Sequence, residues 1–211
     1  MDRRVHRIGT DRALKKLIDA SSRSSSSRAN NIGNNGGSGV LKIYKMELNF
    51  DLYSSSCVNW RDSFACCMAP DPPNPEGLPV ACRDAMFGSS KHVMSLGGLV
   101  FELLSEALGL TTETLKNMDC IKSMYMVCHY YPPCPQPELT LGLGKHSDIT
   151  FITIVLQDNV VGGLQVLQQD CWVDVSPIPG ALVINIGDFL QMMTNDKFKS
   201  RNFKSREVKI P

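Results

Sequence analysis

The sequence predicts an α+β domain that is mainly β, with helical elements first and closely spaced antiparallel strands after them. Two observations support this prediction. Apolar residues recur at three- and four-residue intervals in one upstream segment, which is typical of an amphipathic helix. Downstream of Met124, short stretches rich in β-forming residues alternate with turn signals. Strands that follow one another without intervening helices favour a sandwich or barrel over alternating βα units.

The clearest helix is expected over residues 89–108. Its apolar face comprises Val93, Leu96, Val100, Leu103, Leu104 and Ala107, and Gly109 is placed to end it. A proline-rich connection, residues 70–79, precedes the helix, because proline removes backbone donors and biases its neighbours away from helix. Strands are expected over residues 124–130, 151–156, 164–167, 172–175 and 181–186.

Composition narrows the class of protein. The chain has 211 residues, of which 43% are hydrophobic and 20% are charged, so a packed core is expected. No stretch approaches the roughly 20 apolar residues that cross a bilayer, and the first twenty residues lack the apolar region of a secretory signal. The eight cysteines form no Cys-x-x-Cys pair, which favours reduced structural thiols over zinc ligands. We therefore expect a soluble, cytoplasmic protein with no membrane partner.

The net charge of +1 conceals an uneven distribution. Residues 1–45 carry a net charge of +7 and residues 197–211 a net charge of +5, whereas residues 46–196 carry −11. Neither basic end interleaves aromatic residues with its bases, so solvated tails are favoured and no nucleic-acid partner is expected. Residues 1–39 are predicted to be a basic, low-complexity and disordered segment. An organelle transit peptide is the alternative for this segment, although its three aspartates argue against it.

One local pattern points to chemistry. In His146-Ser147-Asp148, an extended backbone turns residues i and i+2 to the same side, so the imidazole and the carboxylate can converge. These are two of the three ligands in the 2-His-1-carboxylate set that holds non-haem Fe(II) and leaves positions open. A solvated histidine and aspartate at the end of a loop is the alternative for this short pattern.

The surrounding motifs resemble those of the plant 2-oxoglutarate- and Fe(II)-dependent dioxygenases. The matching stretches, in chain order, are 130–135 (YYPPCP), 141–142 (LG), 146–148 (HSD), 156–158 (LQD), 162–166 (GGLQV), 172–173 (WV), 179–183 (PGALV) and 185–188 (NIGD). Upstream, residues 59–62 (NWRD) and 68–70 (MAP) are similar to the branch of 1-aminocyclopropane-1-carboxylate oxidase homologues. The resemblance covers roughly residues 46–200 and does not extend to residues 1–45.

This resemblance implies a double-stranded β-helix, or jelly roll, behind helical N-terminal elements. It divides the chain into a helical part of the dioxygenase fold (40–120), an Fe(II)/2-oxoglutarate dioxygenase domain (121–200) and a divergent basic tail (201–211). It implies an oxidoreductase that uses Fe(II), 2-oxoglutarate and O2 on a small-molecule substrate, with His146 and Asp148 as metal ligands. Tyr131 matches a tyrosine that helps to hold 2-oxoglutarate, although a half-buried structural tyrosine is the alternative. His129 stands where the family usually has an asparagine, and we expect a core or pocket-lining residue there.

The sequence departs from the family after Ser200. The family continues with a His-Arg pair that supplies the third iron ligand, followed by an Arg-x-Ser motif for the distal carboxylate of 2-oxoglutarate. Here the histidines are His6, His92, His129 and His146, and only Arg201 or Arg206 is placed to replace the family arginine. The second hypothesis is therefore a truncated, catalytically impaired member with an incomplete jelly roll and at most a binding role. We expect such a fold to expose apolar side chains and to self-associate through open strand edges.

Overall fold

The computed structural model describes residues 45–48, 59–157 and 162–206. The predicted disordered segment, residues 1–39, lies outside the described residues. The described chain forms two compact units, one built mainly from residues 63–130 and the other from residues 59–62 and 131–206. The predicted family-domain limits at residues 120 and 121 stay a prediction.

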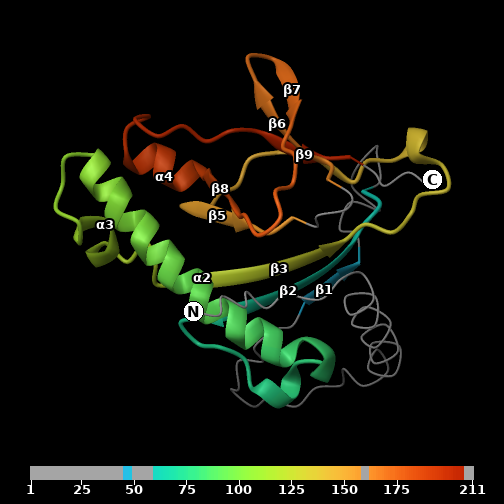
Figure 1. Ribbon diagram of the computed structural model, residues 1–211, viewed down its shortest axis with the longest axis horizontal. Coiled ribbons are helices and arrows are strands. Elements are labelled where there is room, and N and C mark those ends of the chain that lie inside the picture. Colours follow the sequence, from blue (N-terminus) through green and yellow to red (C-terminus); the bar gives the residue numbers. More distant parts are fainter. Residues whose placement is uncertain (1–44, 49–58, 158–161, 207–211) are drawn as a thin grey trace, which may run out of the picture. The chain divides into compact units, whose positions relative to one another are not determined.

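The first unit combines a three-stranded sheet with a long helix. The sheet has the order β1 (Lys45–Leu48), β2 (Asp62–Ala69) and β3 (Met124–Tyr130), which lie side by side in Figure 1. Along β3 the side chains alternate, so Met124, Met126 and Cys128 are half-buried whereas Tyr125 and Val127 are exposed. The half-buried set packs on a buried cluster that comprises Phe64, Cys66, Met68, Leu78, Cys82 and Met86. This apolar cluster from β2 and the start of the helix is the core of the unit.

The helix α2 (Val80–Ala107) begins earlier than the sequence predicts. The prediction placed its start at residue 89, close to the first residues of the apolar periodicity. In the structure the Ser90 hydroxyl donates to the carbonyl of Phe87 at 2.9 Å, inside the helix. Pro79 takes the N-cap position, which agrees with the end of the proline-rich connection and its short 3₁₀ turn η2 (Pro75–Gly77). The predicted end near Gly109 is confirmed, since that residue has φ 76°.

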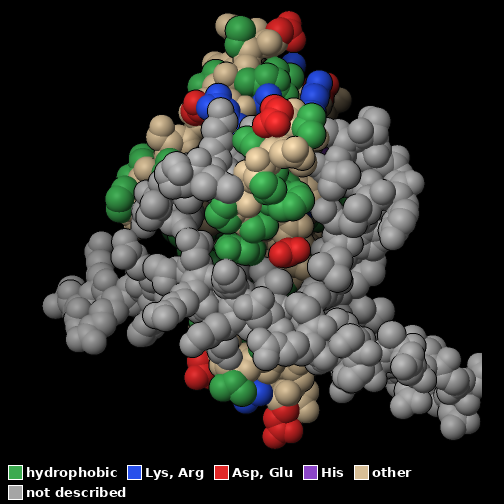
Figure 2. Space-filling view, turned by 90° about the vertical axis from the view of Figure 1, so that its right-hand side faces the viewer, with side chains coloured by type: hydrophobic (Ala, Val, Ile, Leu, Met, Phe, Trp, Pro, Cys, Tyr) green, Lys and Arg blue, Asp and Glu red, His purple; other side chains and the backbone are tan. Residues whose placement is uncertain are grey.

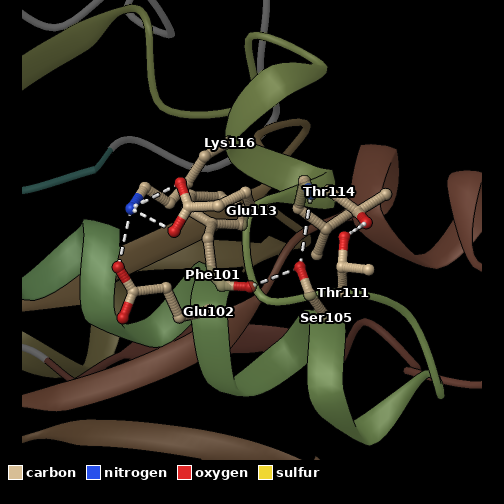
Figure 3. A network of polar contacts seen from close by, with 8 residues as sticks. Phe101, Glu102, Ser105, Thr111, Glu113, Thr114 and Lys116 are labelled. Atoms are coloured by element: carbon tan, nitrogen blue, oxygen red, sulfur yellow. Dashed lines mark hydrogen bonds and ion pairs between the residues drawn. The ribbon is translucent and has the colours of Figure 1, made fainter.

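A polar network joins α2 to the short helix α3 (Thr114–Asn117). The Ser105 hydroxyl, which is fully buried, donates to the carbonyl of Phe101 at 2.8 Å and accepts from the backbone N–H of Leu115 at 3.2 Å (Figure 3). Nearby, the Lys116 ammonium lies between Glu102 and Glu113 at 2.6 and 3.1 Å. These hydrogen bonds raise the pKa of Lys116. The network fixes the connection that leads the chain back to β3.

The second unit is built from antiparallel strands. A four-stranded sheet has the order β4 (Leu143–His146), β9 (Phe203–Ser205), β6 (Leu164–Gln168) and β7 (Cys171–Asp174). A separate pair joins β5 (Ile152–Val155) to β8 (Val183–Ile186), as Figure 1 shows. The short turn η3 (Pro137–Leu139) precedes β4, and helix α4 (Asp188–Met193) follows β8. The prediction of a mainly β fold of jelly-roll type is confirmed, and the described strands do not close a barrel. The expected order of helices before strands is wrong for the described residues, because β1 and β2 precede α2.

The last described residues correct one prediction. Residues 201–211 were expected to form a divergent basic tail outside the sheet. Instead residues 203–205 form β9, which pairs with β4 on one side and with β6 on the other. Phe203 is buried, and the Lys204 ammonium lies 4.4 Å from the centre of the Trp172 ring on the opposite face. Alternate residues of a strand point to opposite faces of the sheet, so Phe203 packs on one face and Lys204 on the other. The net charge of the segment does not reveal this alternation.

The expectation of exposed apolar side chains is confirmed for the described residues. Hydrophobic side chains reach the surface (Figure 2), and those beside β5 and β8 include Leu156, Leu182 and Ile184. The seven described cysteines carry free thiols, and burial raises the pKa of Cys82 to about 11. Within the described part of the chain, no helix is both long and apolar enough to cross a membrane. Pairing of the strand edges with a second copy stays a prediction.

Candidate metal centre

The end of β4 brings an imidazole and a carboxylate together. His146 is the last residue of the strand, and Asp148 follows two residues later. Their side chains converge, with Nε2 of His146 3.6 Å from Oδ1 of Asp148. Both side chains are partly exposed, at 36% and 24%. The alternation of side chains along an extended backbone therefore predicted this juxtaposition correctly.

A backbone carbonyl sets which nitrogen of the imidazole carries the proton. Nδ1 of His146 lies 2.9 Å from the carbonyl oxygen of Gly144, which can only accept a hydrogen bond. Nδ1 is therefore the donor, and in the neutral ring Nε2 presents a lone pair toward Asp148. The N–H of Gly144 in turn donates to Oδ1 of Asn59 at 3.0 Å, and Asn59 is buried. Asn59, in the motif of residues 59–62, thus holds the strand segment that orients His146.

An amide and a helix start fix the carboxylate. Nδ2 of Asn185, at the end of β8, donates to Oδ2 of Asp148 at 2.8 Å, so Oδ1 is the oxygen that faces His146. The backbone N–H of Asp188 donates to the main-chain carbonyl of Asp148 at 2.7 Å. The sequence analysis did not identify this contact, because Asn185 and Asp148 are 37 residues apart and no local pattern connects them.

Asp188 lies at the start of α4. Aspartate is typical of the N-cap position, but here Gly187 is the N-cap and Asp188 is the first helical residue. The Asp188 carboxylate accepts from the Ser147 hydroxyl at 2.8 Å. The hydroxyls of Ser200 and Ser147 hold the pKa of Asp188 below its ordinary value. Residue 147, between the two candidate ligands, is therefore tied to α4.

Gly187 allows the chain to pass close to the segment after Asp148. A Cβ atom at this position would lie 2.0 Å from the carbonyl oxygen of Thr150, which no structure accommodates without moving backbone. The N–H of Gly187 donates to the carbonyl of Phe151 at 2.9 Å, and the Phe151 and Phe189 rings lie 5.9 Å apart. This close approach joins α4 and β8 to the loop that carries the carboxylate.

The pair can act as two ligands of one metal ion. Two ligands that each lie about 2.1 Å from an ion at a right angle are separated by roughly 3 Å, close to the observed 3.6 Å. Nε2 and Oδ1 are both acceptors in the neutral-imidazole state, so a cation between them would satisfy both. Among the residues that the structure describes, however, no group of three His, Cys, Asp or Glu side chains could hold a metal ion. The described residues supply two donors and not a complete three-ligand set.

The other two residues that sequence reasoning singled out lie elsewhere along the chain. Tyr131 directly follows β3 and is half-buried, and its role toward 2-oxoglutarate stays a prediction. His129 lies near the end of β3 with an exposed side chain, so it is not a core residue, and the expected alternative of a pocket-lining residue stays a prediction. Its Nδ1 is 2.8 Å from the Ser63 hydroxyl on the neighbouring strand β2. The alternation along β3 turns position 129 away from the buried cluster.

Comparison with known proteins agrees with this fold. Residues 122–202 match the model of the 2OG-Fe(II) oxygenase superfamily, and the chain belongs to that superfamily. Among plant proteins it is 77% identical over 161 residues to 1-aminocyclopropane-1-carboxylate oxidase homolog 7 of Arabidopsis thaliana, and 74% identical over 159 residues to homolog 6. The matches cover 76% and 75% of this chain, which places it in the branch of these homologues. The chain spans about half the length of these relatives, 46% and 44%.

Solved structures show the same fold. A crystal structure of JOX2 in complex with 2OG, Fe and JA is 31% identical, with a TM-score of 0.69 over 73% of this chain and 47% of JOX2. A 2-oxoglutarate complex of AtDAO1, the dioxygenase for auxin oxidation 1 from Arabidopsis thaliana, is 20% identical with a TM-score of 0.68. That likeness covers 95% of this chain and 73% of AtDAO1. At such low identity, AtDAO1 informs the fold alone.

Proposed function

We propose that this chain carries the oxygenase domain of a 2-oxoglutarate- and Fe(II)-dependent dioxygenase that acts on a small organic metabolite. The observation that carries the proposal is the 3.6 Å approach of His146 Nε2 to Asp148 Oδ1 at the end of β4. Membership of the 2OG-Fe(II) oxygenase superfamily supports it. The JOX2 structure, which contains 2OG and Fe, supports the same cofactor and cosubstrate.

In this proposal the residues of the chain have distinct tasks. His146 and Asp148 donate to the metal ion, the Gly144 carbonyl keeps the proton on the far nitrogen of the imidazole, and Asn185 holds the second carboxylate oxygen. Tyr131 is proposed to help hold 2-oxoglutarate. When bound, the ion supplies a centre for 2-oxoglutarate and O2 in an oxidation of the substrate.

The proposal extends to the cellular location and the partners of the protein. We propose a cytoplasmic protein without nucleic-acid or membrane partners. Seven free thiols among the described cysteines support a reducing compartment, where thiols persist. Self-association through the exposed edges beside β5 and β8 is part of the proposal, because Leu156, Leu182 and Ile184 offer apolar surface there.

Anaerobic titration of the 211-residue chain with Fe(II) tests the metal ligands. We expect His146→Ala and Asp148→Ala each to abolish binding at the wild-type stoichiometry, because each removes one of two protein donors. His92→Ala, which removes an exposed histidine from α2, is the matched control and should bind as the wild type does. Succinate release that depends on both Fe(II) and 2-oxoglutarate, and that is lost in both ligand variants, would support the reaction class. Fe(II) binding unchanged in His146→Ala and Asp148→Ala would contradict the proposal.

A further inference from the structure

The strand that lies beside the candidate metal ligands presents an aromatic side chain to them. Strands β4 and β9 are antiparallel, and after a β-bulge or irregularity between Leu143 and His146 the residues His146 and Phe203 are direct partners. Directly opposed residues of an antiparallel pair point to the same face, with Cβ atoms about 4.5–5.5 Å apart. Phe203 therefore stands on the same side of the sheet as His146.

The surroundings of Phe203 hold it in this place. On its other side, Val166 of β6 is its direct partner, so the phenyl group lies in a row between an imidazole and an isopropyl group. Only 8% of Phe203 is exposed. The next residue, Lys204, pairs with Gln165 and points to the opposite face, where it meets Trp172. A slip of β9 by one residue against β6 would place the lysine where the buried phenylalanine lies, so the register of these two strands is well specified.

A third metal ligand from a neighbouring strand would have to come from this position. A facial ligand set needs three donors that converge on one side of the ion. Asp148 lies two residues after His146 on the same segment, and Asn185 is already bonded to the second oxygen of Asp148. Asp188 is bonded to Ser147. The residue directly across the ladder from His146 is the one whose side chain reaches the same point.

We infer that Phe203 occupies the third ligand position of the metal site, so that the described part of the chain supplies only two donors to a divalent metal ion. The inference rests on the proposed function, because it presupposes that His146 and Asp148 bind a metal ion. A phenyl group offers no lone pair, and its bulk occupies the space that a donor or a water molecule would need. The wild-type chain should consequently hold its metal ion weakly.

The test replaces Phe203 and titrates the full chain with Co(II), followed by its visible absorption. Phe203→His places a second imidazole opposite His146, and we expect it to tighten Co(II) binding at least about 10-fold, since even indirect support of a ligand is worth about 10- to 100-fold. Lys204→His is the matched control: it adds the same side chain one residue along β9 but on the opposite face. It should leave the affinity unchanged. Adding His146→Ala to Phe203→His should return the affinity to the wild-type level or below.

A second variant keeps the test decisive if Phe203→His does not fold. Phe203→Ala removes the phenyl group and leaves the third ligand position empty. Added imidazole should therefore tighten Co(II) binding to this variant and have no such effect on the wild type. Co(II) binding that is equally tight in the wild type, folded Phe203→His and imidazole-treated Phe203→Ala would overturn the inference. The outcome is separate from that of the proposed function. Tight Co(II) binding by Phe203→His without any 2-oxoglutarate-dependent succinate release would leave the inference standing and count against the reaction class.

Discussion

Removal of the Asn185 amide should measure how strongly the fold holds the candidate metal carboxylate. In Asn185→Ala, the Oδ2 atom of Asp148 loses a 2.8 Å donor, while the backbone bond to Asp188 remains. A hydrogen bond to a charged group contributes about 1.5–3 kcal/mol to stability. Because 24% of the Asp148 side chain is exposed, water replaces part of the lost bond, and we expect the lower half of that range. The predicted destabilisation is therefore about 1.5–2 kcal/mol.

A double-mutant cycle isolates this contact. The free energy of unfolding is measured by urea denaturation at pH 7 for the wild type, Asn185→Ala, Asp148→Ala and the double variant. The coupling energy should be about 1–2 kcal/mol, because the two side chains share one bond. Asn185→Asp keeps the shape but sets an acceptor against an acceptor, and it should destabilise more than alanine. A coupling energy below about 0.3 kcal/mol, the level of independent sites, would refute the positioning role of Asn185.

Three further predictions concern the packing and the pH dependence of stability. Gly187→Ala should lower the free energy of unfolding by about 1–3 kcal/mol, because the added Cβ would lie 2.0 Å from the carbonyl oxygen of Thr150. Gly88→Ala, which adds a methyl group in open space on α2, should raise it by about 0.5–1 kcal/mol in the same urea assay. Ser105→Ala should lower stability by about 1–3 kcal/mol, because a buried backbone N–H loses its acceptor, and a thermal melt unchanged within error would contradict this. The Asp188 pKa is lowered by folding, so its contribution is complete above the unfolded pKa of about 3.9 and is lost as the pH falls through the folded value. Ser147→Ala should therefore destabilise at pH 6, and the difference from the wild type should shrink below about pH 3.9; a difference that grows on acidification would be inconsistent with this account.

The periodicity of apolar residues predicted those elements that pack one side on the core. Met124, Met126 and Cys128 alternate along β3, and the strand was predicted with its observed bounds. The start of α2 was missed by nine residues, because the prediction stayed close to the first residues of the apolar periodicity, whereas the N-cap residue, Pro79, lies further upstream.

The candidate site was predictable to the extent that it is local. His146 and Asp148 are two residues apart, so backbone alternation alone brings them together. The residues that surround them come from distant strands: Asn185 is 37 residues from its partner Asp148, and Phe203 meets His146 only through the β4–β9 register. Three residues of β9 are too few to produce a periodic signal, and their neighbours are basic. Only the assembled sheet shows that Phe203 faces the site.

The central position of β9 has a consequence for how the second unit forms during synthesis. Strands β6 and β7 are neighbours in the chain and can pair as soon as both have left the ribosome, whereas β4 gains its place in the sheet only through β9. The nascent chain must therefore carry β4 unpaired within that sheet while more than fifty further residues are made. Pairings between distant segments form late, because closing the long loop costs conformational entropy before the new contacts can stabilise the chain. The strand that ends in His146 is thus among the last to dock, and chaperones and proteases have their longest access to it.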